Sequence, residues 1–375
     1  MKLAASRRVA GLAVISAVAL TLAACGGSEA DENGGGSEAT EEGAALSGTL
    51  PGAGASSQEN AVNSWLAGFT EQHPDVQASY DPVGSGTGRE QFISGATLWG
   101  GTDAAFDEEE LAQGAERCYG GEVVELPLYI SPIAVAYNLP GLGVENLNLQ
   151  PETLAGIFNG DITTWNDPAI AEANPDVELP DTDIVPVNRS DDSGTTENFT
   201  EYLAAAAGDA WPHEASETWP ISGTQSGAQT SGVVSTLEAA EGTIAYLDAS
   251  QVPDGFGTVA VGVGEEFVPF SPEAAAAVVD ASPAAEDATD LRLTIDLARD
   301  TEESGTYPIV LVSYTMACSV YESEQDAENV KALLSYIASE EGQERAADPS
   351  VAGSAPISDD LRTEVEAAIE QISVA

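Results

Sequence analysis

Short β-rich runs alternate with runs of helical apolar spacing along most of this 375-residue chain. Such alternation predicts an α/β architecture with largely parallel sheets. The length is sufficient for two domains, each with its own core. The β-rich runs are 76–80, 123–128, 133–137 and 184–187, and the helix-like runs are 61–69, 152–158, 197–207, 232–240 and 327–340.

The N-terminal residues predict export. Three basic residues precede an apolar run, 9–20, that is too short for a comfortable transmembrane helix. The stretch Leu22-Ala23-Ala24-Cys25-Gly26 follows and looks like a bacterial lipobox, in which the cysteine is lipidated and becomes the new first residue. The alternative is an ordinary secretory signal with an incidental cysteine. We therefore expect a signal peptide over 1–24 and lipidation at Cys25.

The residues after Cys25 differ in composition from the rest of the chain. Residues 26–45 contain only Gly, Ser, Thr, Asn, Ala and acidic residues, so they cannot bury enough apolar surface to fold. We expect a disordered acidic tether over 25–45 and a folded part that begins near Leu46. If the folded part has two lobes, the chain is expected to cross between them near Leu128–Ile130 and Pro308–Val312.

The chain is strongly acidic, with 63 Asp and Glu residues against 11 Lys and Arg and a net charge of -52. This charge argues against binding to nucleic acid or to an anionic membrane surface, because both are held by Lys and Arg. Apart from Cys25, the chain contains two cysteines, Cys118 and Cys318. In an oxidising compartment they form either a disulfide or two buried free thiols.

Three Gly/Ser/Thr-rich loops lead into predicted helices. In the first, Ser56 and Glu59 have capping-box spacing, and in the second Thr87 and Glu90 repeat it. The third loop is 192–196. A helix start offers unpaired backbone N–H donors and a partial positive charge. The loops are therefore either simple helix caps or parts of a polar pocket for a small anion.

Two charged residues favour the pocket. Arg189 precedes the third loop, and its planar guanidinium suits tetrahedral oxyanions; alternatively it forms a surface ion pair with Asp191 or Asp192. Asp103 lies among small and apolar residues. It is either a solvated turn residue or an acceptor for an anion that still carries a proton, as hydrogen phosphate does and sulfate does not.

At these residues the chain resembles the phosphate-binding lipoproteins of bacterial ABC phosphate importers. The resemblance spans nearly the whole folded part. Two features depart from the family: Ser-Ser at 56–57, where a threonine and an aromatic residue are common, and a longer acidic segment around 271–300. The motifs that carry the resemblance are GAGASS (52–57), VGSGTGREQF (83–92), GGTDAAF (100–106), NLPGL (138–142), IFNGDITTWNDPAI (157–170), PVNRSDDSGTTENFTEYL (186–203), EGTIAYL (241–247) and YPIVLVSYT (307–315).

The resemblance implies a two-lobe periplasmic-binding-protein fold of type II, with lobe 1 at 46–129 plus 312–375 and lobe 2 at 130–311. It also implies a monomer, lipid-anchored to the outer face of the cytoplasmic membrane, that captures inorganic phosphate and delivers it to ABC permease subunits. In this role Asp103 accepts the phosphate proton and Asp191 braces Arg189. The phosphate contacts implied by the motifs are Ser56, Ser57, Ser85, Asp103, Arg189, Ser193, Gly194 and Thr195.

Other functions find less support in the residues. The only histidines are His73 and His213, in contexts typical of surface turns, which leaves little for a serine–histidine catalytic site or a zinc cluster. We expect no enzymatic activity, metal or cofactor. The alternatives are a binder of another tetrahedral oxyanion such as sulfate, a secreted phosphatase, a dinucleotide-binding protein and a structural envelope protein.

Overall fold

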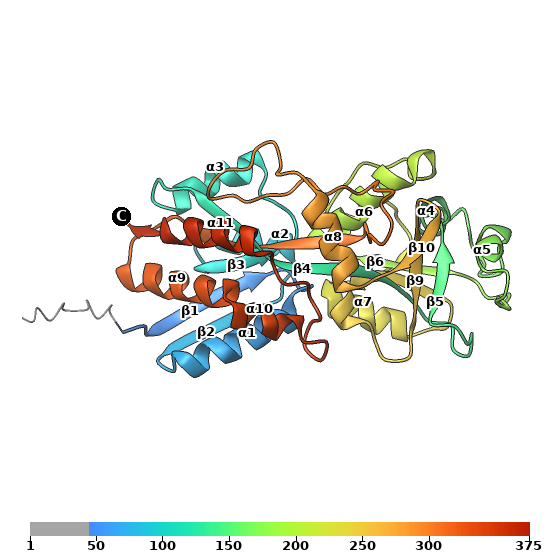
Figure 1. Cartoon of the computed structure of the whole chain (residues 1–375), viewed down its shortest axis with the longest axis horizontal. Coiled ribbons are helices and arrows are strands. Elements are labelled where there is room, and N and C mark those ends of the chain that lie inside the picture. Colours follow the sequence, from blue (N-terminus) through green and yellow to red (C-terminus); the bar gives the residue numbers. More distant parts are fainter. Residues whose placement is uncertain (1–44) are drawn as a thin grey trace, which may run out of the picture. The chain divides into compact units, whose positions relative to one another are not determined.

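The computed structural model describes residues 45–375 (Figure 1). The predicted signal peptide, Cys25 and the predicted tether up to residue 44 lie outside the described residues. Among residues 45–375, no helix is both long enough and apolar enough to span a membrane.

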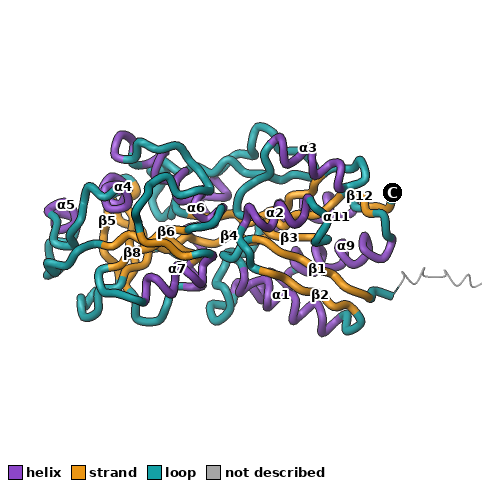
Figure 2. The backbone as a smooth tube through the Cα atoms, turned by 180° about the vertical axis from the view of Figure 1, so that it is seen from behind, coloured by secondary structure: helices purple, strands orange, loops and turns teal. Residues whose placement is uncertain are grey.

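Residues 45–375 form an eleven-stranded mixed sheet with helices packed around it, and β12 and β13 pair separately (Figures 1 and 2). The main path runs β2-β1-β3-β11-β4-β8-β6-β7, and β9 joins β4 to β5 and β10. The strands are β1 (Gly48–Gly54), β2 (Val76–Asp81), β3 (Trp99–Thr102), β4 (Val123–Tyr137), β5 (Asn146–Leu149), β6 (Val185–Arg189), β7 (Gln225–Gly227), β8 (Thr243–Asp248), β9 (Gly257–Val263), β10 (Glu266–Pro269), β11 (Val310–Cys318), β12 (Val320–Tyr321) and β13 (Ser373–Val374).

Strand β4 connects two halves of this sheet. Its residues 123–132 pair with β11, whereas residues 133–137 pair with β8. We call β1, β2, β3, β11 and the first part of β4 the first half-sheet, and the second part of β4 with β5 to β10 the second half-sheet. All 15 residues of β4 are buried. The two β-rich runs predicted at 123–128 and 133–137 are therefore parts of one strand.

The prediction of largely parallel sheets is wrong. The pairs β1–β2, β1–β3, β6–β8, β6–β7 and β5–β9 are parallel. At the centre, however, β11 is antiparallel to β3 and β4, and β4 is antiparallel to β8 and β9. A strand buried on both faces is a continuous apolar run in either direction. The hydrophobic pattern therefore identified strands without giving their direction.

The helix-like runs all form helices, with boundaries that differ by a few residues. The run predicted at 327–340 corresponds to α9, which ends at Ala338, and a further helix, α10, begins at Glu340. The Ser339 hydroxyl caps α10 by accepting from the Gly342 N–H at 3.1 Å. The helices are α1 (Glu59–Gln72), α2 (Ser85–Ile93), α3 (Glu108–Arg117), α4 (Pro151–Asn159), α5 (Pro168–Ala173), α6 (Gly194–Ala206), α7 (Gln229–Glu238), α8 (Pro272–Ala281), α9 (Glu324–Ala338), α10 (Glu340–Ala347) and α11 (Asp359–Glu370), with 3₁₀ turns η1 (Gly208–Ala210) and η2 (Ala249–Gln251).

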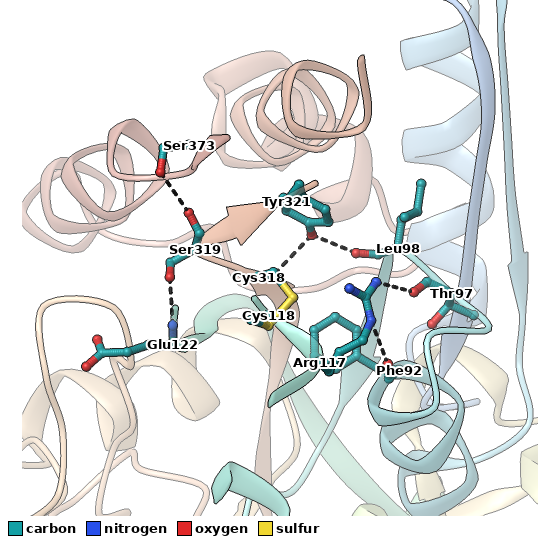
Figure 3. The surroundings of a disulfide bond; sticks show 10 residues. All are labelled: Phe92, Thr97, Leu98, Arg117, Cys118, Glu122, Cys318, Ser319, Tyr321 and Ser373. Atoms are coloured by element: carbon teal, nitrogen blue, oxygen red, sulfur yellow. Dashed lines mark hydrogen bonds between the residues drawn. A yellow bond between two sulfur atoms is a disulfide. The ribbon is translucent and has the colours of Figure 1, made fainter. Parts of the chain in front are cut away.

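A disulfide between Cys118 and Cys318 joins the end of α3 to the end of β11 (Figure 3). Both cysteines are fully buried. Nearby, the Tyr321 hydroxyl accepts from the Cys318 N–H at 3.0 Å and donates to the Leu98 carbonyl at 2.7 Å. The bridge therefore lies within a hydrogen-bonded part of the first half-sheet.

We predict that replacing both cysteines by alanine lowers the free energy of unfolding by about 2–5 kcal/mol, because the bridge closes a long loop in the unfolded chain. The two cysteines are 200 residues apart. Urea unfolding of the parent with and without reductant measures the effect, and the double-alanine variant, insensitive to reductant, is the control. Equal stability of the reduced and oxidised parent would contradict the prediction.

Candidate anion-binding site

The candidate site lies where parallel strands of both half-sheets end. In the first half-sheet, β1 leads to Ser56 and Ser57, β2 leads to Ser85, and β3 leads directly to Asp103. In the second half-sheet, Arg189 is the last residue of β6. The carboxyl ends of parallel strands meet at one edge of a sheet, and the helices that follow begin there. The topology thus brings loops from distant parts of the sequence to one place.

Asp103 is the centre of this cluster. Its two carboxylate oxygens each accept from the Ser57 hydroxyl at 2.8 Å, and Oδ2 also accepts from the Thr195 hydroxyl at 2.9 Å. Its own N–H donates to Ser85 Oγ at 3.1 Å. The side chains come from the starts of α1, α2 and α6, and Asp103 is 4% exposed. Asp103 is therefore a buried acceptor, and the solvated-turn alternative is wrong.

The environment of Asp103 affects its ionisation in opposing ways. Burial raises the pKa of its carboxyl group, while hydrogen bonds from Ser57 and Thr195 and the charge of Arg189 lower it, and the net direction is upward. A carboxylate in such surroundings gains from any further donor that approaches it. An unpaired buried acceptor would cost about 1–3 kcal/mol or more.

Arg189 is held by a buried ion pair. Its Nε donates to Asp191 Oδ1 at 2.9 Å and one Nη donates to Oδ2 at 2.5 Å. The Gln229 N–H also donates to Asp191 Oδ1, at 2.9 Å. Burial raises the pKa of Asp191, but hydrogen bonds and charge from Arg189 outweigh it and lower the pKa overall. Arg189 is 4% exposed, so the pair with Asp191 is not a surface ion pair.

Two glycines allow the helix starts to approach the charged residues closely. A Cβ atom on Gly194, the first residue of α6, would lie 2.7 Å from Asp103 Cβ and 2.8 Å from the Ala104 nitrogen. Gly84 precedes α2 with a φ of 96°, and its Cβ would lie 2.7 Å from Asp191 Oδ2. A side chain at either position would force the two halves of the site apart.

Two of the three expected caps are wrong. Ser56 does not cap α1; its hydroxyl accepts from the Thr230 N–H at 3.0 Å and lies 3.0 Å from Thr230 Oγ1. Helix α2 begins at Ser85 without a side-chain cap, which places Thr87 inside it. The third loop does cap, since Ser193 Oγ accepts from the Thr196 N–H at 3.2 Å. Ser56 and Glu59 have capping-box spacing, but the Ser56 hydroxyl bonds Thr230 of α7 instead of an N–H of α1.

Several residues around the site carried no recognised motif role. Gln251 donates to the carbonyls of Ser56 and Ser57 at 2.8 and 2.9 Å. Asn198 donates to the Asp103 carbonyl at 2.7 Å. Arg299, from the segment after α8, donates to Asn198 Oδ1 and to Glu201. The rarity of arginine could have identified Arg299, whereas Gln251 gave no signal.

An acidic cavity of about 660 Å³ adjoins the cluster. Its wall includes Asp103, Glu197, Glu201 and Arg299. Burial raises the pKa of Glu197 to about 7, helped by the negative charges of Glu217 and Glu201, while Arg89 and Arg299 oppose the shift. Glu197 thus titrates near neutral pH at the first turn of α6.

The fold and the cluster define a class of protein: a two-lobe α/β protein whose helix starts gather around a small, buried polar cluster. Residues 39–341 match the family model described as PBP superfamily domain. The chain belongs to this family of solute-binding proteins.

Known proteins resemble the chain over most of its length. It is 34% identical to phosphate-binding protein PstS 3 of Mycobacterium tuberculosis over 371 residues, which cover 97% of this chain and 98% of the relative. It is 32% identical to PstS 2 of the same organism over 374 residues, covering 98% and 99%.

Solved structures support the fold. A phosphate-binding protein from Stenotrophomonas maltophilia matches with a TM-score of 0.66 at 18% identity, covering 86% of this chain and 94% of that one. The high affinity periplasmic phosphate-binding protein PfluDING, bound with phosphate, matches with a TM-score of 0.69 at 20% identity, covering 85% and 93%. The expected two-lobe periplasmic-binding-protein fold is confirmed.

We predict that Glu197→Gln raises the melting temperature at pH 8 by at least about 2 °C and has little effect near pH 4.5. The folded-state pKa lies above the ordinary value of 4.5, so ionisation of Glu197 disfavours the folded state as the pH rises through 4.5 to 7. Melting curves across this range measure the difference. Glu201→Gln is the control, because it removes a partner of Arg299 and is expected to destabilise the protein. A pH-independent effect of Glu197→Gln would contradict the prediction.

Proposed function

We propose that this chain is an extracytoplasmic solute-binding protein that captures inorganic phosphate and delivers it to the permease of an ABC importer. The observation that carries the proposal is the buried carboxylate of Asp103 among hydroxyl donors and helix starts, beside the braced guanidinium of Arg189. The similarity to proteins named phosphate-binding protein PstS over 97–98% of the chain supports it.

The proposed contacts supply a charged donor, neutral N–H donors and one acceptor to the anion. Arg189 offers a planar charged donor, kept in orientation by Asp191. The helix starts offer N–H groups that have no carbonyl partner within their own helix. Asp103 offers an acceptor. The residues proposed to contact phosphate are Ser56, Ser57, Ser85, Asp103, Arg189, Ser193, Gly194 and Thr195.

Selectivity in this proposal follows from the ligand's proton. Hydrogen phosphate can donate a hydrogen bond to the Asp103 carboxylate. Sulfate has no proton at neutral pH, so it would place an unprotonated oxygen against a buried negative charge. An uncompensated group of this kind costs on the order of 1–3 kcal/mol, and more when it is charged. The site would therefore reject a ligand that is nearly identical in shape.

We also propose the cellular setting that the N-terminal sequence indicates. Removal of residues 1–24 would leave a lipidated Cys25, and the tether up to residue 45 would separate the folded part from the outer face of the cytoplasmic membrane. The proposed lobes are 46–129 plus 312–375 and 130–311. The proposed state is a monomer with no enzymatic activity.

We predict that phosphate-stripped protein binds phosphate with a stoichiometry of one, and that Arg189→Ala weakens this binding by about 2–5 kcal/mol, because it removes a charged partner from a desolvated anion. Titration calorimetry measures both. Arg345→Ala is the matched control, since Arg345 is 33% exposed and pairs with Glu71 and Glu341. No heat with the parent would refute the proposed function, and full affinity in Arg189→Ala would remove Arg189 from the site.

We predict that Asp103→Asn narrows the preference for phosphate over sulfate. An asparagine amide is neutral and can donate to sulfate, so the penalty against sulfate decreases while phosphate loses a charged acceptor. Competition titrations with the two anions measure the ratio. Asp191→Asn is the control, because it loosens Arg189 and should weaken the binding of phosphate and of sulfate alike. An unchanged ratio in Asp103→Asn would show that Asp103 does not determine selectivity.

A further inference from the structure

Arg89 joins the two half-sheets beside the candidate site. It lies in α2, which packs against β1 and β3 of the first half-sheet, and it is 5% exposed. Its Nε donates to the Glu110 carboxylate of α3 at 2.9 and 3.0 Å. Its two Nη atoms donate to the Glu217 carboxylate at 3.0 and 2.6 Å. Glu217 precedes β7 of the second half-sheet, so one guanidinium bridges both halves.

On the first half-sheet, Arg89 also supports the turn that carries Asp103. One Nη donates to the Thr102 hydroxyl at 3.0 Å. The same hydroxyl donates to the Ala104 carbonyl at 2.7 Å. Thr102 and Ala104 flank Asp103, so this pair of bonds fixes the backbone from which the acceptor carboxylate projects.

On the second half-sheet, Glu217 supports the start of α6. Its main-chain carbonyl accepts from the Ser193 N–H at 3.1 Å. Ser193 is the N-cap of α6, whose first turn carries Gly194 and Thr195. Arg89 is therefore linked through Thr102 to the backbone that carries Asp103. Through Glu217 it is linked to Ser193 at the start of α6.

The surroundings make this ion pair stronger than an ordinary surface pair. The side chains of Arg89 and Glu217 are 6% and 18% exposed, and the contact is bidentate. Glu110 also binds Arg89, at 2.9 Å, from within the same half-sheet. Glu217 is thus the one carboxylate partner of Arg89 among the described residues that belongs to the opposite half-sheet.

We propose that the Arg89–Glu217 ion pair is a latch that holds the two half-sheets together over the enclosed ligand and sets the rate at which the ligand leaves. Arg89 is a positioning residue, because it acts through Thr102 and Glu217 and belongs to none of the proposed phosphate contacts. This inference rests on the proposed function. It adds the element that determines retention of the anion.

Release of radiolabelled phosphate into excess unlabelled phosphate tests the latch. We expect Glu217→Gln to raise the release rate about tenfold, with little change in the association rate, because affinity differences among variants of one interface lie mostly in dissociation. Glu110→Gln is the matched control: it alters the same guanidinium within one half-sheet, and glutamine keeps the capping position that Glu110 occupies in α3. We expect it to change the release rate by less than about twofold.

A second variant separates latching from general destabilisation. Arg89→Gln should accelerate release at least as much as Glu217→Gln, because it also removes the bonds to Thr102 and Glu110. Adding Glu217→Gln to Arg89→Gln should change release little further, since the ion pair is already lost. Unchanged release in Glu217→Gln, or equal acceleration by Glu110→Gln, would overturn the latch while leaving phosphate binding intact. A parent protein that binds no phosphate would instead refute the proposed function.

Discussion

A buried carboxylate surrounded by hydroxyl donors is the constraint on which the site depends. Asp103 is 4% exposed and accepts hydrogen bonds from the starts of two helices, α1 and α6, that belong to different half-sheets. An isolated charge at this depth would be costly. The cost is offset by convergence of donors from both half-sheets, so the same bonds that stabilise Asp103 also hold the halves of the protein together. Site and fold are coupled through one side chain.

This arrangement explains how a chain with a net charge of -52 can hold an anion. Exposed charges more than about 10 Å away are largely screened at ordinary salt. Donors at contact distance in a buried site are not screened in this way, and the Arg189 guanidinium is held 2.5 Å from the Asp191 carboxylate. The acidic wall of the neighbouring cavity affects stability instead, because ionisation of Glu197 in helix α6, with a pKa of about 7, disfavours the folded state. Local geometry outweighs global charge.

Sequence patterns predicted the helices and strands better than they predicted how the strands pair. Every predicted helical run became a helix, because apolar spacing reports directly on a buried face. Strand direction and the continuity of β4 were missed. The apolar pattern of a strand that is buried on both faces does not show in which direction the strand runs. Asp103, Ser57, Ser85, Arg189 and Thr195 do gather together. Ser56 instead bonds Thr230. Gln251, in η2, donates to the Ser56 carbonyl, and the Glu217 carbonyl accepts from the Ser193 N–H; neither residue belongs to a motif. Arg89 stood within a quoted motif, and its rarity was the available signal.

The most direct measurement is a high-resolution structure of the phosphate complex. The account predicts a tetrahedral anion between the starts of α1, α2 and α6, with one phosphate oxygen about 2.5–2.7 Å from an Asp103 carboxylate oxygen, the distance of a charge-assisted O–H···O⁻ bond. It also predicts a guanidinium contact from Arg189. An anion bound elsewhere, or one whose nearest oxygen stays outside hydrogen-bond distance of Asp103, would contradict the central claim.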